Sequence, residues 1–114
     1  MKYLCLIYED QSQLPVLPQA EIEKAMAEYQ AFTVDLKKSK HCIQYGAFPP
    51  NTTTTVRVRN GKLSMTDGPF AETKEQLGVY YLIEAADLNQ AIRVAEKIPS
   101  ARWGSVEIRP VMEF

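Results

Sequence analysis

Residues 78–84 read GVYYLIE and residues 2–8 read KYLCLIY, two short runs whose apolar side chains fall on both alternating sets of positions. A strand with one buried face alternates apolar and polar residues, whereas apolar residues at both parities are typical of a central strand covered on both faces. The two runs therefore predict two central strands of one sheet. Tyr80 and Tyr81 are expected on opposite faces, because successive side chains of a strand point to opposite sides.

Two helices are expected beside these strands. Residues that suit a buried helix face recur at intervals of three and four over residues 19–39; they are Ile22, Met26, Tyr29, Phe32, Thr33 and Leu36. Asp87 is expected to cap a second helix, with Gln90 in the capping-box position. That helix is predicted to run to about Lys97, before Pro99 ends it, and to bury Leu88, Ala91, Ile92, Ala95 and Ile98.

A hairpin is predicted between the two halves of the chain. Asn-Gly at residues 60–61 lies between two runs with alternating apolar residues, which is a strong hairpin signal. A two-residue turn pairs Val58 with Leu63 and Val56 with Met65. These apolar side chains then share one face of the hairpin, and the other face carries the cations Arg57, Arg59 and Lys62.

A short strand at residues 41–46 and an alternating strand at residues 105–114 complete the order strand, helix, strand, hairpin, strand, helix, strand. This order predicts an α+β fold, a ferredoxin-like antiparallel sheet with two helices on one face, in a single domain over residues 1–114. The helices can cover one face only, and the chain is too short to cover the other. We therefore expect a symmetric homodimer packed sheet against sheet, with a cleft near the interface.

The charge balance excludes some classes of partner. The 114-residue chain is 46% hydrophobic and has 13 basic and 14 acidic residues, with a net charge of -1. This composition offers no electrostatic footprint for nucleic acid or an anionic membrane. The apolar run at the N-terminus is too short to span a membrane and lacks an export cleavage region. We expect a cytoplasmic protein whose partners are a second copy and a small molecule.

Cysteine and histidine usage argues against several kinds of site. Cys5 and Cys42 lie in two predicted strands and are expected to be reduced core thiols. His41 is the single histidine, at the expected surface, and no zinc-ligand spacing, nucleophilic triad or glycine-rich phosphate loop is present. We expect no cofactor and no such metal site, while a carboxylate-held metal stays open.

The richest stretch for chemistry is TDGPFAET at residues 66–73. Asp67 and Glu72 flank a Gly-Pro turn, and paired carboxylates on a loop can divide acid and base work when their environments separate their pKa values. The alternative is structural, because Asp before Gly also forms turns and an exposed Glu is usually only solvated. Phe70 and Thr73 of the same loop are candidate ligand contacts.

Three further residues are candidates for ligand binding. Tyr29 would donate a hydrogen bond to a ligand at the mouth of the cleft, or else lie in the core with its hydroxyl satisfied. Glu107 and Arg109 share the polar face of the last strand, where the guanidinium can fork onto a ligand carboxylate. The alternative for this pair is an ion pair at the interface.

The stretches TDGPFAETKEQLGVYYLIEA at 66–85, DLNQAI at 87–92 and SVEIRPVMEF at 105–114 resemble the DGPF-type, YCII-related proteins. The resemblance covers nearly the whole chain and implies a ferredoxin-like dimer of the dimeric α/β barrel kind. The founding YCII-type branch is thought to use a His on the first helix and an Asp before a Pro. Tyr29 and Ile98 stand at those positions here, so the dyad is not carried over, and Asp67 on another loop is the candidate to replace the acid.

Three functions follow as hypotheses. The first is a homodimer that binds a small organic ligand in a cleft lined by Tyr29, Asp67, Phe70, Glu72 and Arg109, with a hydrolase- or isomerase-like acid/base reaction left open. The second is a non-catalytic regulatory or accessory module, because genes of DGPF-type proteins often lie beside those of extracytoplasmic-function sigma factors. The third is a metal-free oxygenase resembling other dimeric α/β barrels.

Overall fold

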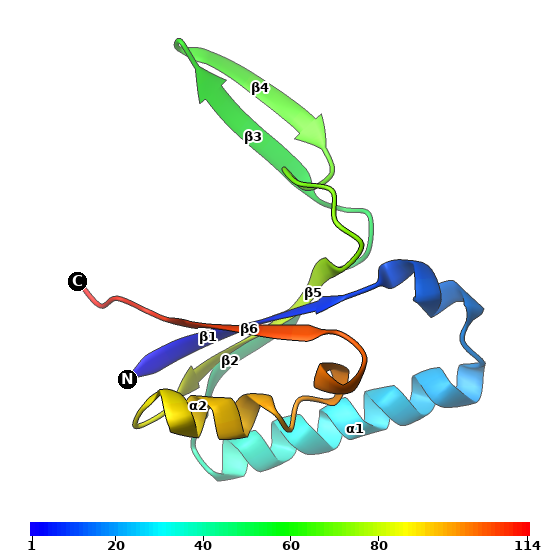
Figure 1. Cartoon of the computed structure of the whole chain (residues 1–114), viewed down its shortest axis with the longest axis vertical. Helices are drawn as coiled ribbons and strands as arrows, with labels where there is room; N and C mark the ends of the chain where they lie inside the picture. Colours follow the sequence, from blue (N-terminus) through cyan, green and yellow to red (C-terminus); the bar gives the residue numbers. More distant parts are fainter.

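The computed structural model describes the backbone of residues 1–114 and every side chain except those of residues 14 and 15. One antiparallel sheet has the strand order β2-β5-β1-β6. Its strands are β1 (Lys2–Glu9), β2 (Cys42–Ala47), β5 (Gln76–Glu84) and β6 (Ser105–Pro110). The helices α1 (Gln19–Lys38) and α2 (Leu88–Ala95) both lie on one side of this sheet (Figure 1). The predicted α+β class is confirmed, and the order is consistent with a ferredoxin-like fold.

Shorter elements join these parts. The 3-10 helix η1 (Gln11–Val16) follows β1, and the 3-10 helix η2 (Pro99–Arg102) connects α2 to β6. Strands β3 (Thr54–Arg59) and β4 (Lys62–Asp67) form a separate two-stranded sheet. No helix in the described part of the chain is both long and apolar enough to cross a membrane.

The core lies between the helices and the central strands. Tyr3, Cys5 and Ile7 of β1 and Tyr81 and Ile83 of β5 are buried on the helix side. The register pairs Cys5 with Tyr81 and Tyr3 with Ile83, so these side chains form one continuous layer. Burial of a large aliphatic side chain contributes about 1.5 to 3 kcal/mol, so this layer is a main source of stability.

Helix α2 differs from its prediction in length and in the face that it buries. The helix ends at Ala95 rather than near Lys97. Leu88 and Ile92 were expected in the core but are 49% and 46% exposed, while Val94 is buried. Ala91, Ala95 and Ile98 are buried as predicted, and the small alanine side chains allow the helix to approach its neighbour closely.

The cap of α2 follows the predicted pattern with one change. The Asp87 side chain accepts a hydrogen bond from the Gln90 amide at 2.8 Å, which confirms the N-cap. Gln90 Oε1 accepts from the Ala86 amide at 2.6 Å, one residue before the position that a capping box would use. The first bond satisfies an amide that the first turn of a helix leaves unpaired, and the second fixes the residue that precedes the N-cap.

Helix α1 confirms the predicted range to within one residue but not the whole predicted face. Thr33 and Leu36 are buried, whereas Met26 is 66% exposed. Its N-terminal half therefore carries apolar side chains that the rest of the chain leaves partly uncovered.

The second face of the sheet carries apolar side chains that no helix covers. Leu4 pairs with Leu82, and Leu6 pairs with Tyr80, and all four are half-buried. Tyr81 on the helix side is buried, so the two tyrosines lie on opposite faces as predicted. We call the surface formed by Leu4, Leu6, Tyr80 and Leu82 the open face.

A glycine allows Tyr80 to lie flat on this face. A Cβ built on Gly46 of β2 would lie 2.6 Å from Cε1 of Tyr80, closer than non-bonded atoms approach. The tyrosine ring also stacks on Phe48, with ring centroids 5.7 Å apart. The missing side chain at Gly46 thus lets an aromatic surface extend across the edge of the sheet.

The hairpin projects away from the main sheet, on the side opposite the helices (Figure 1). Its register is the predicted one, with Val58 opposite Leu63 and Val56 opposite Met65. The turn places Asn60 and Gly61 at φ values of 53° and 75°, as a primed turn requires. The apolar face of the hairpin is exposed, with relative accessibilities of 57% to 68% for these residues.

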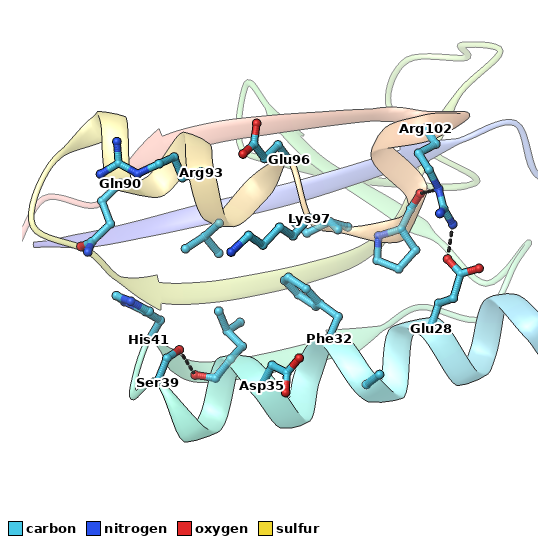
Figure 2. A pocket seen from close by; sticks show the side chains of 15 residues that line it. Glu28, Phe32, Asp35, Ser39, His41, Gln90, Arg93, Glu96, Lys97 and Arg102 are labelled. Carbon is cyan, nitrogen blue, oxygen red and sulfur yellow. Dashed lines mark hydrogen bonds and ion pairs between the residues drawn. The ribbon is translucent and has the colours of Figure 1, made fainter.

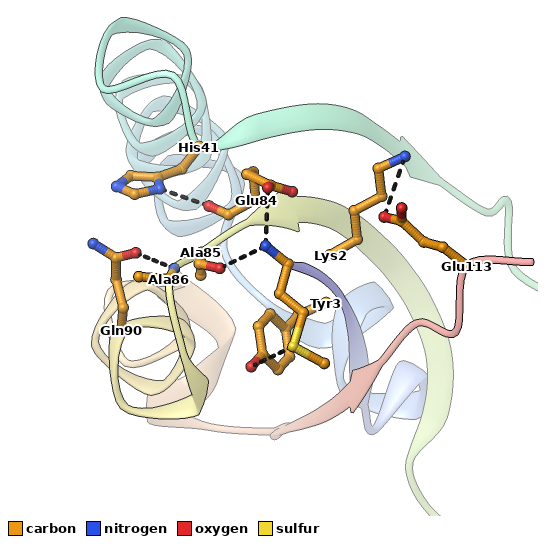
Figure 3. A network of polar contacts seen from close by, with 9 residues as sticks. Lys2, Tyr3, His41, Glu84, Ala85, Ala86, Gln90 and Glu113 are labelled. Atoms are coloured by element: carbon orange, nitrogen blue, oxygen red, sulfur yellow. Dashed lines mark hydrogen bonds and ion pairs between the residues drawn. The ribbon is translucent and has the colours of Figure 1, made fainter.

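A polar network ties the start of β1 to its neighbours (Figure 3). The amino group of Met1 donates to Glu84 Oε1 at 2.9 Å and to the Ala85 carbonyl at 3.1 Å. His41 Nδ1 lies 2.7 Å from the Glu84 carbonyl oxygen. Since a carbonyl oxygen can only accept, this geometry assigns the proton to Nδ1. His41 therefore has a structural contact at the end of β5.

Candidate functional site

Two cavities flank α1. One is a groove of about 790 Å³ between α1 and α2, called here the helix groove (Figure 2). The other, called the relay cavity, has about 630 Å³ and lies between α1 and the β2-β5 side of the sheet. Tyr29, which the sequence singled out, lines the relay cavity.

The helix groove is larger, but its polar groups are those of an ordinary surface. Acidic and basic side chains face each other across it, and Arg102 pairs with Glu28 (Figure 2). The other charged residues on its walls are Asp35, His41, Arg93, Glu96 and Lys97. All of these except His41 are exposed. Exposed charges of both signs offer little specific chemistry.

A chain of hydrogen bonds joins two residues that line the relay cavity, Tyr29 and Glu9, through a buried hydroxyl that does not line it. Ser100 is fully buried, and its Oγ lies 2.5 Å from the Tyr29 hydroxyl. The same Oγ donates to Oε1 of Glu9. Because Ser100 has one hydroxyl proton and gives it to the carboxylate, Tyr29 must be the donor to Ser100. We call Tyr29, Ser100 and Glu9 the hydroxyl relay; they come from α1, η2 and the end of β1.

Local sequence explains why Ser100 lies at this point. Pro99 begins η2, where its fixed φ suits the first turn and its missing amide is not needed. Gly104 then packs so closely against β1 that a Cβ on it would overlap the Tyr8 carbonyl oxygen. The Gly104 amide also donates to the Ser100 carbonyl at 2.7 Å. Proline and glycine together hold Ser100 beside Glu9.

The environment of Tyr29 keeps its phenol protonated. Burial raises the pKa of Tyr29 to about 12, and the negative charge of Glu9 adds to this effect. The hydrogen bond with Ser100 acts in the opposite direction but is outweighed. At neutral pH the phenol is therefore a neutral donor linked to a carboxylate through one hydroxyl.

A second hydroxyl chain runs along the floor of the relay cavity. Thr33 donates to the Tyr29 carbonyl at 2.9 Å, so the Tyr81 hydroxyl, 2.7 Å from Thr33 Oγ1, donates to it. Tyr81 stacks on Tyr45, with centroids 5.6 Å apart. Lys37 Nζ lies 4.9 Å from the centroid of the Tyr45 ring. The floor is thus aromatic and ends at a cation.

The remaining walls of the relay cavity are mainly apolar. They are formed by Leu17, Ile22, Ala25, Met26, Val34, Ala47, Val79 and Trp103. An apolar cavity of this volume with a few convergent polar groups has the usual character of a small-molecule site. In the described part of the chain, no cluster of three or more His, Cys, Asp and Glu side chains is arranged to hold a metal ion.

The loop at residues 66–73, which contains most of the predicted site residues, does not reach this cavity within one chain. Asp67 is the last residue of β4, and Phe70, Glu72 and Thr73 follow it in the segment that leads to β5. All four are exposed, Phe70 at 79%, and none lines either cavity. Thr73 Oγ1 donates to the Glu75 carbonyl at 2.5 Å, a local turn contact.

Glu107 and Arg109 lie on the open face, away from Tyr29. Their register pairs them with Leu6 and Leu4 of β1. Arg109 Nε lies 3.2 Å from Glu107 Oε2, and Tyr8 donates to the same oxygen at 3.4 Å. The two residues thus form an exposed ion pair within the chain, and a single chain does not join them to the hydroxyl relay.

Glu9 and Ser100 are the site residues that sequence reasoning missed. Glu9 was considered only as the end of the N-terminal apolar run, and Ser100 was not considered. A polar residue at the end of a buried strand is a signal that could have identified Glu9 as a candidate site residue. No local pattern marks Ser100, because its role depends on contact with residues 71 and 91 positions away.

Comparisons with known proteins assign the chain to a family. The model of the YCII-related domain matches residues 1–114. An uncharacterised protein of Rhizobium meliloti (strain 1021) is 34% identical over 114 residues, which cover 97% of this chain and 92% of the relative. The match spans all the elements that build the sheet and the relay cavity. The chain therefore belongs to the YCII-related family.

Proposed function

We propose that this protein acts as a homodimer that binds a small organic molecule in the relay cavity and carries out acid/base chemistry at Tyr29. The observation that carries the proposal is the fully buried Ser100 hydroxyl, which links the Tyr29 phenol to the Glu9 carboxylate. A buried hydroxyl with two partners is held in one geometry. Such a link can move a proton between the cavity and the carboxylate.

In the proposed reaction, a proton passes from the ligand through Tyr29 and Ser100 to Glu9. A ligand O–H or activated C–H gives its proton to the Tyr29 oxygen as the Tyr29 proton passes to Ser100. The Ser100 proton then passes to Glu9, which ends as a neutral acid while the ligand ends as the anion. The reverse sequence returns a proton to the ligand at a second atom, which is an isomerase-like reaction. A proton delivered to a leaving group would instead assist hydrolysis.

The homodimer is supported by two apolar surfaces that one chain leaves uncovered. The open face presents Leu4, Leu6, Tyr80 and Leu82, and the hairpin presents a second apolar face. Isolated two-stranded hairpins are marginal in water, and exposed apolar patches usually mark an interface. A second copy packed on the open face would cover it and bring its own hairpin alongside.

In such a dimer, the predicted loop residues have a natural role. Asp67 ends the hairpin, which projects from the open-face side (Figure 1), and Phe70, Glu72 and Thr73 follow it. We infer that the loop of one protomer contacts its partner, near the Glu107–Arg109 pair at the interface. This interface would combine residues of both chains on the face of the sheet opposite the relay cavity.

The direct test compares ligand binding and turnover in Tyr29→Phe and wild-type protein. Candidate ligands are found by a thermal shift screen of small organic molecules, and hits are checked for proton exchange with deuterated water by NMR. Ligand-dependent exchange that is lost in Tyr29→Phe supports the proposal. Tyr3→Phe is the matched control, because Tyr3 is a buried tyrosine whose hydroxyl contacts only Met1 Sδ among the described side chains.

A second candidate function is a regulatory or accessory module without catalysis. The exposed apolar face of the hairpin, at Val56, Val58, Leu63 and Met65, favours it as a contact for another protein. Native mass spectrometry separates the two candidates. A homodimer with saturable ligand binding supports the first, whereas a monomer without ligand binding supports the second.

A further inference from the structure

The relay cavity has a charged group at each end. Glu9 lies at one end and accepts a hydrogen bond from Ser100. Lys37 lines the other end, in the last turn of α1. None of the ion pairs formed by the described residues includes Lys37. The cavity is therefore polarised, with a hydrogen-bonded carboxylate at one end and an ammonium group without an acidic partner at the other.

Lys37 is held toward the cavity by the aromatic floor. Its Nζ lies 4.9 Å from the Tyr45 ring centroid and 3.4 Å from the Tyr45 hydroxyl. The contact with an aromatic ring orients the ammonium while leaving donors for another group. The neighbouring Lys38 lines neither cavity, so this position is specific to Lys37.

We propose that the ligand of the relay cavity is an apolar or aromatic carboxylic acid, bound with its carboxylate on Lys37 and its reacting group toward Tyr29. This inference rests on the proposed function of the same cavity and specifies the class of ligand. An ammonium near an apolar surface forms its strongest contacts with anions, and a carboxylate accepts charge-assisted hydrogen bonds. Glu9 at the opposite end repels a carboxylate, so the charges set the orientation of the ligand.

Tyr29 and Lys37 lie eight residues apart on the same helix, so their Cα atoms are about 12 Å apart along its axis. A ligand that contacts both side chains therefore lies along α1. The stacked Tyr45 and Tyr81 rings favour a flat body.

The experiment uses the full-length protein and pairs of neutral and anionic probes. 4-Hydroxybenzoate, 3-phenylpropionate and hexanoate are each compared with the corresponding amide by chemical-shift titration of backbone amides. The acids are expected to shift resonances of cavity residues and to bind at least about tenfold more tightly than the amides, the loss expected for one charge-assisted hydrogen bond.

Variants at the helix end give the second arm of the experiment. Lys37→Gln is expected to weaken the acids about tenfold and to leave the amides unchanged, whereas Lys37→Arg retains most of the affinity for acids. Lys38→Gln is the matched control and is expected to change neither. Equal binding of acids by wild-type protein and Lys37→Gln would overturn the assignment.

The outcomes separate this inference from the proposed function. If amides bind in the cavity as tightly as acids and their chemical-shift changes depend on Tyr29, the carboxylate assignment is overturned while the proposed function stands. Failure of all acids and amides to perturb the cavity at millimolar concentration would count against both.

Discussion

Gly104 lies against the backbone of Tyr8 so closely that no residue with a Cβ fits there without displacing one of the two segments. This contact joins the segment after η2 to the end of β1. Glu9 directly follows Tyr8, and the Ser100 carbonyl accepts a hydrogen bond from the Gly104 amide, so this contact helps to set the distance between Ser100 and Glu9. A backbone contact outside the relay cavity thus determines the geometry inside it.

Gly104→Ala is expected to destabilise the protein by about 1 to 3 kcal/mol, the usual cost of an added methyl group in a packed site. Urea unfolding measures this change. Gly78→Ala is the control, because its Cβ would meet only Gln11 Nε2 at 3.7 Å. Equal stability of the two variants would contradict the claim that the contact between Gly104 and Tyr8 leaves no room for a side chain.

Ser100→Ala is expected to cost about 1 to 3 kcal/mol, because it leaves the half-buried Tyr29 hydroxyl and the Glu9 carboxylate without their shared partner. A double-mutant cycle with Tyr29→Phe measures the coupling. The double variant should be more stable than the sum of the two single changes predicts, since the second change removes a group that the first left unpaired. Strict additivity would show that the relay contributes no coupling.

The raised pKa of Tyr29 predicts a loss of stability at alkaline pH. Burial raises this pKa to about 12 from the ordinary 10.0, so the folded protein holds the proton more tightly than the unfolded chain does. The contribution is fully present below pH 10 and is lost as the pH rises through the folded pKa. Urea unfolding of wild-type protein between pH 9 and about 12 should show a steeper decline than that of Tyr29→Phe. Parallel declines would exclude Tyr29 as the source.

The two thiols are expected to differ in reactivity. Cys5 is fully buried, and burial raises its pKa to about 11. The pKa of half-buried Cys42 is also raised by burial, but Lys37 partly offsets this effect. With a disulfide reagent at pH 8, Cys42 should react first and Cys5 only at the rate of unfolding. The Cys42→Ser variant isolates the slow reaction, and rapid labelling of that variant would contradict the buried position of Cys5.

A charge on the open face should disrupt the proposed homodimer. Leu6→Glu and Leu82→Glu are each expected to shift sedimentation velocity profiles from dimer toward monomer, because an unpaired carboxylate would be buried at the interface. Leu88→Glu is the control, since Leu88 is 49% exposed on α2. A dimer that survives both open-face substitutions would have another interface.

Much of the fold was predictable because its signals are local. The hairpin register follows from Asn60-Gly61, since a two-residue turn leaves one pairing between the strands. The range of α1 and the cap at Asp87 follow from neighbouring residues alone. The exact buried face of α2 was not predictable in this way. Leu88 and Ile92 belong to the predicted apolar stripe but are exposed, whereas Ala91 and Ala95 of the same stripe are buried as predicted.

The sequence by itself determined the order of the elements, the hairpin register and the apolar character of both sheet faces, because each depends on residue spacing within one segment. Only the tertiary structure brought Tyr29, Ser100 and Glu9 together from three elements and held the loop at Asp67 away from them. Side chains distant in the chain meet through the packing of whole elements. That packing depends on shape and close contact, as at Gly104, and leaves no periodic signal in the sequence.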